Sequence, residues 1–340
     1  MAKKKKTKEK LTPAQEKMIA LKKALNKDVG NVVYEDHEGE YGRVELGAIK
    51  IDYAFGGGLP KGRITELYGW ESTSKSSISL MYLKKFLDES ETNIAMYVDA
   101  EFAHDKKYMK DLGIDLDRVI IATPSTTEDT FKAILSASDL GVGFMIVDSV
   151  SAMMSVQEYE KGMDGQTIGS GARVMSTGLK QVVGNIRKNN ICCIFINQFR
   201  NTIGGYGDNR TTSGGNALKF YASIRAEMKA KKTKAAISLN EEGEAVSNPG
   251  GIYVTKNKTA PPFREASFTS EFGKGINIKE HNVMTAIEEG IIERGGAWYS
   301  IPLKNGEIER VQGSDKVWGF YLNNEEEYQY LYEITKQNFY

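Results

Sequence analysis

The sequence has few cysteines, and the two it has lie side by side. Cys192 and Cys193 occur within the apolar run ICCIFIN in a chain of 340 residues. Neighbouring residues of a strand point to opposite faces, so these two thiols cannot easily form a disulfide bond. We interpret them as two small buried side chains, in preference to a redox pair or a metal site.

Long apolar runs are also missing. Mean hydropathy is −0.42, and no run approaches the roughly 18 apolar residues of a membrane-spanning helix. The basic start MAKKKKTKEK is followed by no apolar stretch, which excludes a secretory signal. We therefore expect no membrane association and a cytoplasmic location.

The chain has no net charge. Lys and Arg number 45, as do Asp and Glu. A nucleic-acid-binding protein of this composition must concentrate its positive charge locally, in loops or on one face of an assembly. The hydrophobic content of 40% and the charged content of 26% are typical of a globular protein that buries a sizeable core.

Short β-rich runs alternate with helical periodicity between residues 62 and 225. The strand-like runs are ITELYG, NIAMYVDAE, RVIIATP, GFMIVDS and CCIFINQ, and residues 75–88 carry the apolar spacing of a helix. This alternation predicts an α/β fold with a mostly parallel twisted sheet and helices on both faces. We expect a hairpin or loop insertion at 229–250.

Two smaller units are expected beside this core. Residues 1–37 predict a basic tail and a helix, whose apolar face (Ala20, Leu21, Ala24, Leu25) is typical of a docking arm. The core is assigned to 38–272, and a small α+β domain to 273–340.

The strongest local motif is GWESTSKS at 69–76, which follows a strand and opens a helix. Such a phosphate-binding loop (P-loop) wraps its backbone N–H groups around phosphates at a helix N-terminus. Lys75 would reach the β- and γ-phosphates of ATP, and the Ser76 hydroxyl would bind Mg²⁺. Ser74 stands where the pattern has glycine, which costs about 1–3 kcal/mol if the backbone is glycine-like there.

Three polar residues close strand-like runs. Asp148 follows FMIV, as expected of a carboxylate that orients the water shell of Mg²⁺. Glu101 is a candidate general base for the attacking water, or else a solvated loop carboxylate. Gln198 cannot act as a base, but it can sense the γ-phosphate through hydrogen bonds and so act as a switch.

In this order the residues resemble the bacterial RecA family over roughly 40–300. The segments that carry the resemblance are GGGLPKGRITELYG, YVDAE, IVDSVSAM, ARVMS, FINQFR, TTSGGNALKFYAS, TKNKTAPPF and GAWYS. The resemblance implies a RecA-type ATPase core, ATP and Mg²⁺ as cofactors, and a helical homopolymer on single-stranded DNA. The implied activity is DNA-stimulated ATP hydrolysis with strand exchange into a homologous duplex, and single-strand-binding or loader proteins are further possible partners.

The resemblance also assigns a nucleotide site. It gives catalytic roles to Lys75, Glu101 and Gln198. Lys256 and Lys258 match lysines that reach the ATP of the neighbouring subunit, although on their own they would be taken for exposed strand lysines. The implied nucleotide and magnesium contacts are Gly69, Glu71, Ser72, Thr73, Ser74, Lys75, Ser76, Ser77, Asp105, Tyr108 and Asp148.

Two polar, glycine-rich loops, 158–171 and 199–213, match the DNA-binding loops of the family. Ile168 and Ile203 match positions that insert an apolar side chain between base triplets; the alternative is two ordinary surface loops. Phe220 and Lys219 match subunit-interface positions, and Phe220 could equally be a core aromatic residue. The other implied DNA-binding residues are Gly169, Arg173, Ser176, Lys180, Arg200, Gly204, Gly214, Gly215 and Asn216.

Departures from the family pattern leave more than one function open. Trp70 and Ser74 replace the usual proline and glycine of the P-loop, which bears on ATP affinity and turnover and not on the fold. Lys180 keeps a charge where arginine is frequent, and the chain ends soon after a short acidic run at 325–327. These features fit a phage-encoded or otherwise divergent member.

We expect an ATP-driven recombinase. One alternative is a RecA-fold DNA-filament scaffold that scarcely hydrolyses nucleotide, and another is a ring-forming helicase. The match to TTSGGNALKFYAS argues against the helicase.

Overall fold

The computed structural model describes residues 17–18, 20–21, 23–24, 42–162, 169–201, 210–230, 238–239 and 245–340. The chain divides into two compact units, 1–41 and 42–340. In the first unit the described residues are helical and exposed, and they include Ala20, Leu21 and Ala24. Leu25 lies outside the described residues.

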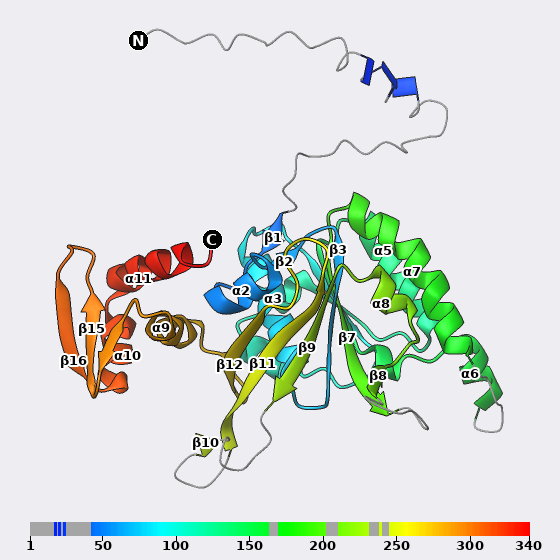
Figure 1. The fold of residues 1–340 in the computed structure, drawn as a ribbon. Coiled ribbons are helices and arrows are strands. Elements are labelled where there is room, and N and C mark those ends of the chain that lie inside the picture. The colour runs from blue at the N-terminus through cyan, green and yellow to red at the C-terminus, as the bar shows by residue number, and fades with distance from the viewer. Residues whose placement is uncertain are drawn as a thin grey trace. The chain divides into compact units, whose positions relative to one another are not determined.

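A large twisted sheet forms the centre of the second unit (Figure 1). Six of its strands run in parallel in the order β9-β3-β7-β6-β4-β5. Their bounds are β3 Arg63–Gly69, β4 Ala95–Asp99, β5 Val119–Ala122, β6 Phe144–Asp148, β7 Cys192–Asn201 and β9 Ile224–Ala230. The predicted mostly parallel sheet is confirmed, and each of the five predicted runs overlaps one of its strands.

The sheet continues past β9 in antiparallel pairing. The further strands are β11 Ala245–Asn257, β12 Glu265–Glu271 and β13 Gly275–Ile276, while β10 Ser238–Leu239 pairs with β11. The predicted insertion at 229–250 is therefore a hairpin, in which β11 pairs with β9 on one side and with β12 on the other.

Helices cover both faces of the sheet because its strands present apolar side chains on both sides. One buried cluster joins the strands to α2 (Ile49–Phe55) and α3 (Lys75–Asp88). The other joins them to α5 (Thr127–Asp139), α7 (Ser170–Lys188) and α8 (Ala217–Tyr221). Cys192 belongs to the first cluster and Cys193 to the second, and both are free thiols as predicted.

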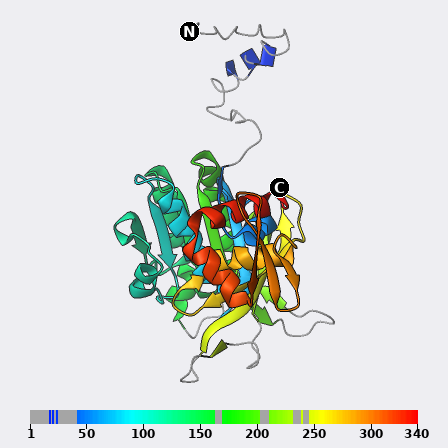
Figure 2. The same cartoon turned by 90° about the vertical axis from the view of Figure 1, so that its left-hand side faces the viewer.

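The C-terminal elements have a hydrophobic cluster of their own, and Figure 2 shows them in front of the sheet. A three-stranded antiparallel sheet (β14 Glu293–Gly295, β15 Trp298–Pro302, β16 Ile308–Gln312) packs with α9, α10 and α11. The bounds of these helices are α9 Ile278–Glu288, α10 Ser314–Asn323 and α11 Glu325–Gln337.

Short elements border the larger ones. They are β1 Arg43–Val44, β2 Leu59–Pro60, α4 Lys106–Asp111, η1 Leu116–Arg118, η2 Val150–Ala152, α6 Val156–Lys161 and β8 Arg210–Thr212. Two of them shorten the predicted DNA loops. A capping box between Ser155 and Glu158 starts α6, so the beginning of loop 158–171 is helical. Loop 199–213 begins and ends in paired strands, because β8 pairs with the end of β7.

Two glycines of α7 test how tightly this helix packs on α5. A Cβ atom on Gly178 would lie 2.1 Å from Cδ2 of Phe131, whereas one on Gly184 would meet nothing within 4 Å. We expect Gly178→Ala to lower the free energy of unfolding by about 1–3 kcal/mol through overpacking. The control Gly184→Ala should raise it by about 0.5–1 kcal/mol. Urea unfolding midpoints measure both changes, and equal effects of the two variants would contradict this packing.

Candidate functional site

A sharp loop joins β3 to α3. Gly69 ends the strand, and a Cβ atom there would lie 2.3 Å from the carbonyl oxygen of Met228. Ser72 and Ser74 have φ values of 58° and 61°. The glycine-like conformation suspected for Ser74 is therefore present, and Ser74 holds it directly before the first turn of α3.

The loop folds around the ammonium group of Lys75. This side chain is buried, and its Nζ lies 2.7 Å from the carbonyl oxygen of Trp70, 3.4 Å from that of Gly69 and 3.2 Å from the hydroxyl of Thr73. The lysine is thus held at the N-terminus of α3, where the helix dipole favours anions.

Asp148 lies at the carboxyl end of β6, opposite the start of α3. Ser76 donates a hydrogen bond of 2.6 Å to its Oδ2, and the hydroxyl of Tyr97 donates another of 2.8 Å. Burial raises the pKa of Asp148 above its usual value, although both hydrogen bonds favour the ionised form. The predicted neighbours Ser76 and Asp148 are therefore in direct contact.

Glu101 and Gln198 also meet at the carboxyl ends of the parallel strands. Gln198 Nε2 donates to Glu101 Oε1 over 3.0 Å, and the Ser149 hydroxyl donates to the same oxygen. Glu101 is exposed to solvent.

A pocket beside Asp148 contains both residues predicted to contact adenine. Asp105 caps α4 by accepting from the backbone N–H groups of Lys107 and Tyr108, and Tyr108 is half-buried. The pocket is lined by Ser76, Leu80, Tyr97, Asp99, Glu101, Ala103, His104, Asp105, Tyr108, Met109 and Asp148.

His104 forms a pair with buried Asp99 in the same pocket, 2.6 Å from Nδ1 to Oδ2. Burial alone would raise the pKa of Asp99. The hydrogen bonds from His104 and Ala103 outweigh burial, and the pKa lies below its usual value.

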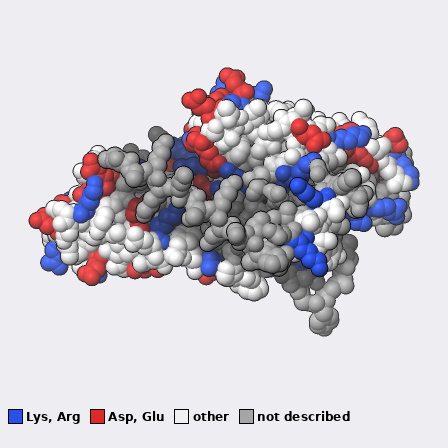
Figure 3. All heavy atoms as spheres, turned by 90° about the horizontal axis from the view of Figure 1, so that it is seen from above, with Lys and Arg blue, Asp and Glu red and all other residues white. Residues whose placement is uncertain are grey.

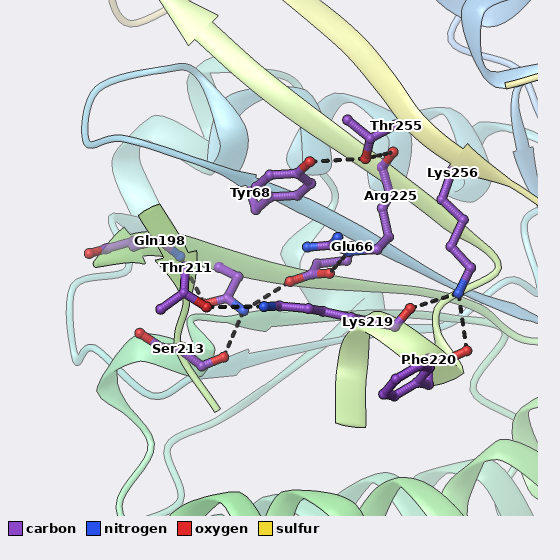
Figure 4. A network of polar contacts seen from close by, with 11 residues as sticks. Glu66, Tyr68, Gln198, Thr211, Ser213, Lys219, Phe220, Arg225, Thr255 and Lys256 are labelled. Atoms are coloured by element: carbon purple, nitrogen blue, oxygen red, sulfur yellow. Dashed lines mark hydrogen bonds and ion pairs between the residues drawn. The ribbon is translucent and has the colours of Figure 1, made fainter. Parts of the chain in front are cut away.

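A buried polar network joins the neighbouring strands β3, β7 and β9 (Figure 4). Glu66 in the middle of β3 accepts from Arg225 Nε at 2.5 Å and from Asn197 Nδ2 at 2.9 Å. Asn197 also donates to the carbonyl oxygen of Ser213 at 3.1 Å, and its Oδ1 accepts from the backbone N–H of Gln198. The network therefore joins Gln198 to the segment that follows β8.

Within this chain, Lys256 and Lys258 lie at the end of α8 and not at the P-loop. Lys256 Nζ donates to the carbonyl oxygens of Lys219 at 2.7 Å and Phe220 at 3.1 Å (Figure 4). Lys258 Nζ lies 3.5 Å from the carbonyl oxygen of Phe220. Burial, followed by the charge of Lys258, lowers the pKa of Lys256 to about 8. The Phe220 side chain is 73% exposed, so it is not a core aromatic residue of this chain.

The described ends of the two predicted DNA loops line a common depression. Gly169 and Gly171 contribute from the first segment, and Arg200, Ser213 and the pair Gly214–Gly215 from the second. Gly214 and Gly215 have φ values of 78° and 73°, and a Cβ atom on either would lie within 3 Å of Val150 or Ala172. Arg200 donates to Ser213 Oγ and to the carbonyl oxygen of Ser151, which ties the segment to η2.

One face of α7 continues from this depression. Arg173, Ser176 and Lys180 follow each other at helical spacing; the first and last are exposed, and Ser176 is partly so. Lys219 donates to Thr211 Oγ1 at 3.0 Å, and Asn216 directly precedes α8. Ile168, Ile203 and Gly204 lie outside the described residues. The face drawn in Figure 3 carries basic and acidic side chains next to one another, in keeping with the zero net charge.

Sequence reasoning missed Tyr97, Ser149 and Glu66. Tyr97 could have been found, because it lies two residues before Asp99 in a strand and therefore on the same face. Glu66 gave a weaker signal, a single acid within the strand-like run ITELYG. Nothing in the sequence indicated that Ser149 would donate to Glu101.

These features define the fold of a P-loop ATPase core. A strand leads through a tight loop with a buried lysine into a helix, and a neighbouring parallel strand ends in a carboxylate. Residues 16–277 match the family described as "RecA N-terminal domain". The chain therefore belongs to the RecA family, whose members act in DNA recombination and repair. Among the described residues, no helix is long and apolar enough to cross a membrane.

Proteins named "Protein RecA" match most of the chain. The one from Nostoc punctiforme is 42% identical over 259 residues, which is 76% of this chain and 70% of that protein. The one from Trichodesmium erythraeum is 38% identical over 83% of this chain and 76% of its own length. The one from Leptospira meyeri is 35% identical over 93% of this chain and 83% of its own length.

From the left-handed backbone at Ser74 we predict how a substitution there changes stability. Glycine adopts φ near 60° without the steric cost of a Cβ atom, but it also loses more backbone entropy on folding. The relief of strain is therefore partly offset, and Ser74→Gly should raise the free energy of unfolding by about 0.5–1 kcal/mol. As a control, Ser136→Gly in the exposed part of α5 should lower it by about 0.5 kcal/mol. Thermal unfolding measures both, and a loss of stability in Ser74→Gly would show that the loop is not strained.

Proposed function

We propose that this protein is an ATP-dependent DNA strand-exchange protein that polymerises on single-stranded DNA. The observation that carries the proposal is the position of Gln198. It donates to the candidate base Glu101, and three residues further along the chain β7 ends at Asn201, directly before the segment 202–209. A change at the nucleotide site therefore acts on a strand that leads into a candidate DNA-binding segment.

The residues at the P-loop fit ATP and Mg²⁺. Lys75 has an ammonium group held by carbonyl and hydroxyl oxygens at a helix N-terminus, and it can exchange these neutral acceptors for phosphate oxygens. Ser76 and Asp148 present a hydroxyl and a carboxylate, which are oxygen ligands of the kind that Mg²⁺ takes, directly or through water. When bound, Mg²⁺ neutralises charge on the phosphates.

Glu101 acts as the general base on the water that attacks the γ-phosphate. Ser149 and Gln198 hold its Oε1 by hydrogen bonds, which leaves Oε2 to accept the proton of that water. Before nucleotide binds, Gln198 keeps the carboxylate oriented. When ATP is bound, Gln198 exchanges its hydrogen bond with Glu101 for one to the γ-phosphate, and Ser149 continues to hold Oε1. Asp105 and Tyr108 contact adenine in the adjoining pocket.

Assembly of the filament completes the site. Lys256 and Lys258, at the carbonyl oxygens of Lys219 and Phe220, reach the ATP of the neighbouring subunit and stabilise charge on the transferred phosphoryl group. The exposed Phe220 ring lies in the subunit interface. The amino-terminal residues 1–37 dock on the next subunit.

Single-stranded DNA lies along the depression and the exposed face of α7. Arg173 and Lys180 bind phosphates, and the backbone around Gly214 and Gly215 comes close to the strand because no Cβ atom intervenes. Such contacts carry no base preference, so Watson–Crick pairing with the homologous duplex supplies the sequence recognition.

Substitution of the proposed base tests this function. Glu101→Gln keeps the hydrogen-bonding shape but cannot take a proton, so DNA-stimulated ATP hydrolysis should fall by about 10²–10⁴-fold. Filaments on single-stranded DNA in the presence of ATP should persist, as seen by electron microscopy. The control Glu91→Gln changes an exposed glutamate beyond α3 and should leave both measurements unchanged. A wild-type protein whose ATP hydrolysis does not respond to single-stranded DNA would contradict the proposal.

A second candidate function rests on Ser74. Its left-handed conformation supports a filament scaffold that binds nucleotide for assembly and scarcely hydrolyses it. The turnover of wild type and Ser74→Gly on single-stranded DNA separates the two functions. We expect comparable rates, within about threefold, for a working recombinase whose loop is only mildly strained. A gain of tenfold or more would favour the scaffold.

A further inference from the structure

We propose that Trp70, through its ring contact with Phe199, is a positioning residue that couples the phosphate loop directly to β7 and β8, the two strands that flank the candidate DNA-binding loop. This inference rests on the proposed function. It assigns a second connection between nucleotide and DNA, separate from the hydrogen bond between Gln198 and Glu101.

Three aromatic rings form one cluster: Tyr68 from β3, Trp70 from the loop that follows β3, and Phe199 from β7. The ring centroids of Trp70 and Phe199 are 5.5 Å apart, and those of Tyr68 and Phe199 are 5.4 Å apart with nearly perpendicular planes. Both spacings lie in the range in which aromatic pairs attract each other. Trp70 makes this contact although 41% of it remains exposed, so the core does not hold its ring.

Cations lie against two of these rings. The guanidinium of Arg210 lies 4.8 Å from the centroid of Phe199, and that of Arg225 lies 4.4 Å from the centroid of Tyr68. Both distances permit cation–π attraction. Phe199 therefore lies between a ring of the phosphate loop and a cation of β8.

On the nucleotide side, the backbone of Trp70 holds the lysine that binds phosphate. Its carbonyl oxygen accepts from Lys75 Nζ at 2.7 Å and from Thr73 Oγ1 at 2.9 Å. When Lys75 turns to a phosphate group, the carbonyl loses its charged donor and keeps only the threonine hydroxyl. The peptide that carries the Trp70 ring is then held by a single side-chain hydrogen bond, and the ring can change its position against Phe199.

On the DNA side, Phe199 is tied to both ends of segment 202–209. It pairs with Thr212 across β7 and β8, and Arg210, the first residue of β8, lies over its ring. The next residue, Arg200, donates to Ser213 Oγ. A shift of the Phe199 ring therefore acts on both strand ends that flank the segment.

Coupling of this kind is reciprocal, and it can be measured as a ratio of affinities. The ratio compares the dissociation constant of a labelled oligo-dT strand without nucleotide with that in the presence of a non-hydrolysable ATP analogue, both by fluorescence anisotropy. We expect Trp70→Ala and Phe199→Ala each to reduce this ratio by about three- to tenfold, the worth of one aromatic pair. Trp70→Phe keeps an aromatic ring and should retain most of the ratio.

Controls separate coupling from general damage. The double variant Trp70→Ala/Phe199→Ala should lose no more than either single variant, because both remove the same contact. Trp298→Ala removes a half-exposed tryptophan of β15 and should leave the ratio unchanged. If Trp70→Ala does not fold, Phe199→Ala tests the same contact from the other side.

The outcomes distinguish this inference from the proposed function. A wild-type ratio well above one that persists in Trp70→Ala or Phe199→Ala overturns the coupling role and leaves the strand-exchange function standing. Independent, additive losses in the double variant also overturn it. A wild-type ratio of one would mean that nucleotide does not control DNA binding, and both proposals would then fail.

Discussion

Strand β3 pairs in parallel with β7, and their register places Gly69 directly beside Gln198. This pairing brings the start of the phosphate loop and Gln198 of β7 to one level of the sheet. The neighbouring pairs put Asp148 opposite Asp99 at the same edge. The site residues meet there because parallel strands all end on the same side of the sheet. Without this register, Lys75, Asp148 and Gln198 would be unrelated polar residues of three strand ends.

Polar contacts below this edge extend the connection to the rest of the molecule. Glu66 is fully buried and satisfied by Arg225 and Asn197, so β3, β7 and β9 are tied by hydrogen bonds between side chains as well as by the backbone. A buried carboxylate with well-placed donors favours one arrangement strongly, because leaving it unpaired in the interior is costly. The phosphate loop therefore follows a strand that is held rigidly by its neighbours, and the candidate DNA-binding segments lie beyond the ends of this network.

Much of the fold followed from periodicity. The five strand-like runs and the helix at 75–88 occur where they were expected, because buried parallel strands are continuous apolar runs and helices have their own spacing. The boundaries of the loops were less predictable. Glu158 belongs to a helix through a capping box, and Phe199 to a strand through pairing with Thr212, and both depend on partners that the local pattern does not reveal. Ile168 and Ile203 remain predictions, as do the site assignments as a whole.

The sequence by itself determined the P-loop, the acids at the strand ends, the order of the family segments and the membership that they indicate, because these are properties of residue type and spacing. Only the tertiary structure decided which residues touch. It placed Ser149 and Gln198 on Glu101, Tyr97 on Asp148 and Trp70 against Phe199. Contacts between residues far apart in the chain depend on the order and the register in which the strands pair, and local sequence does not record which strands become neighbours.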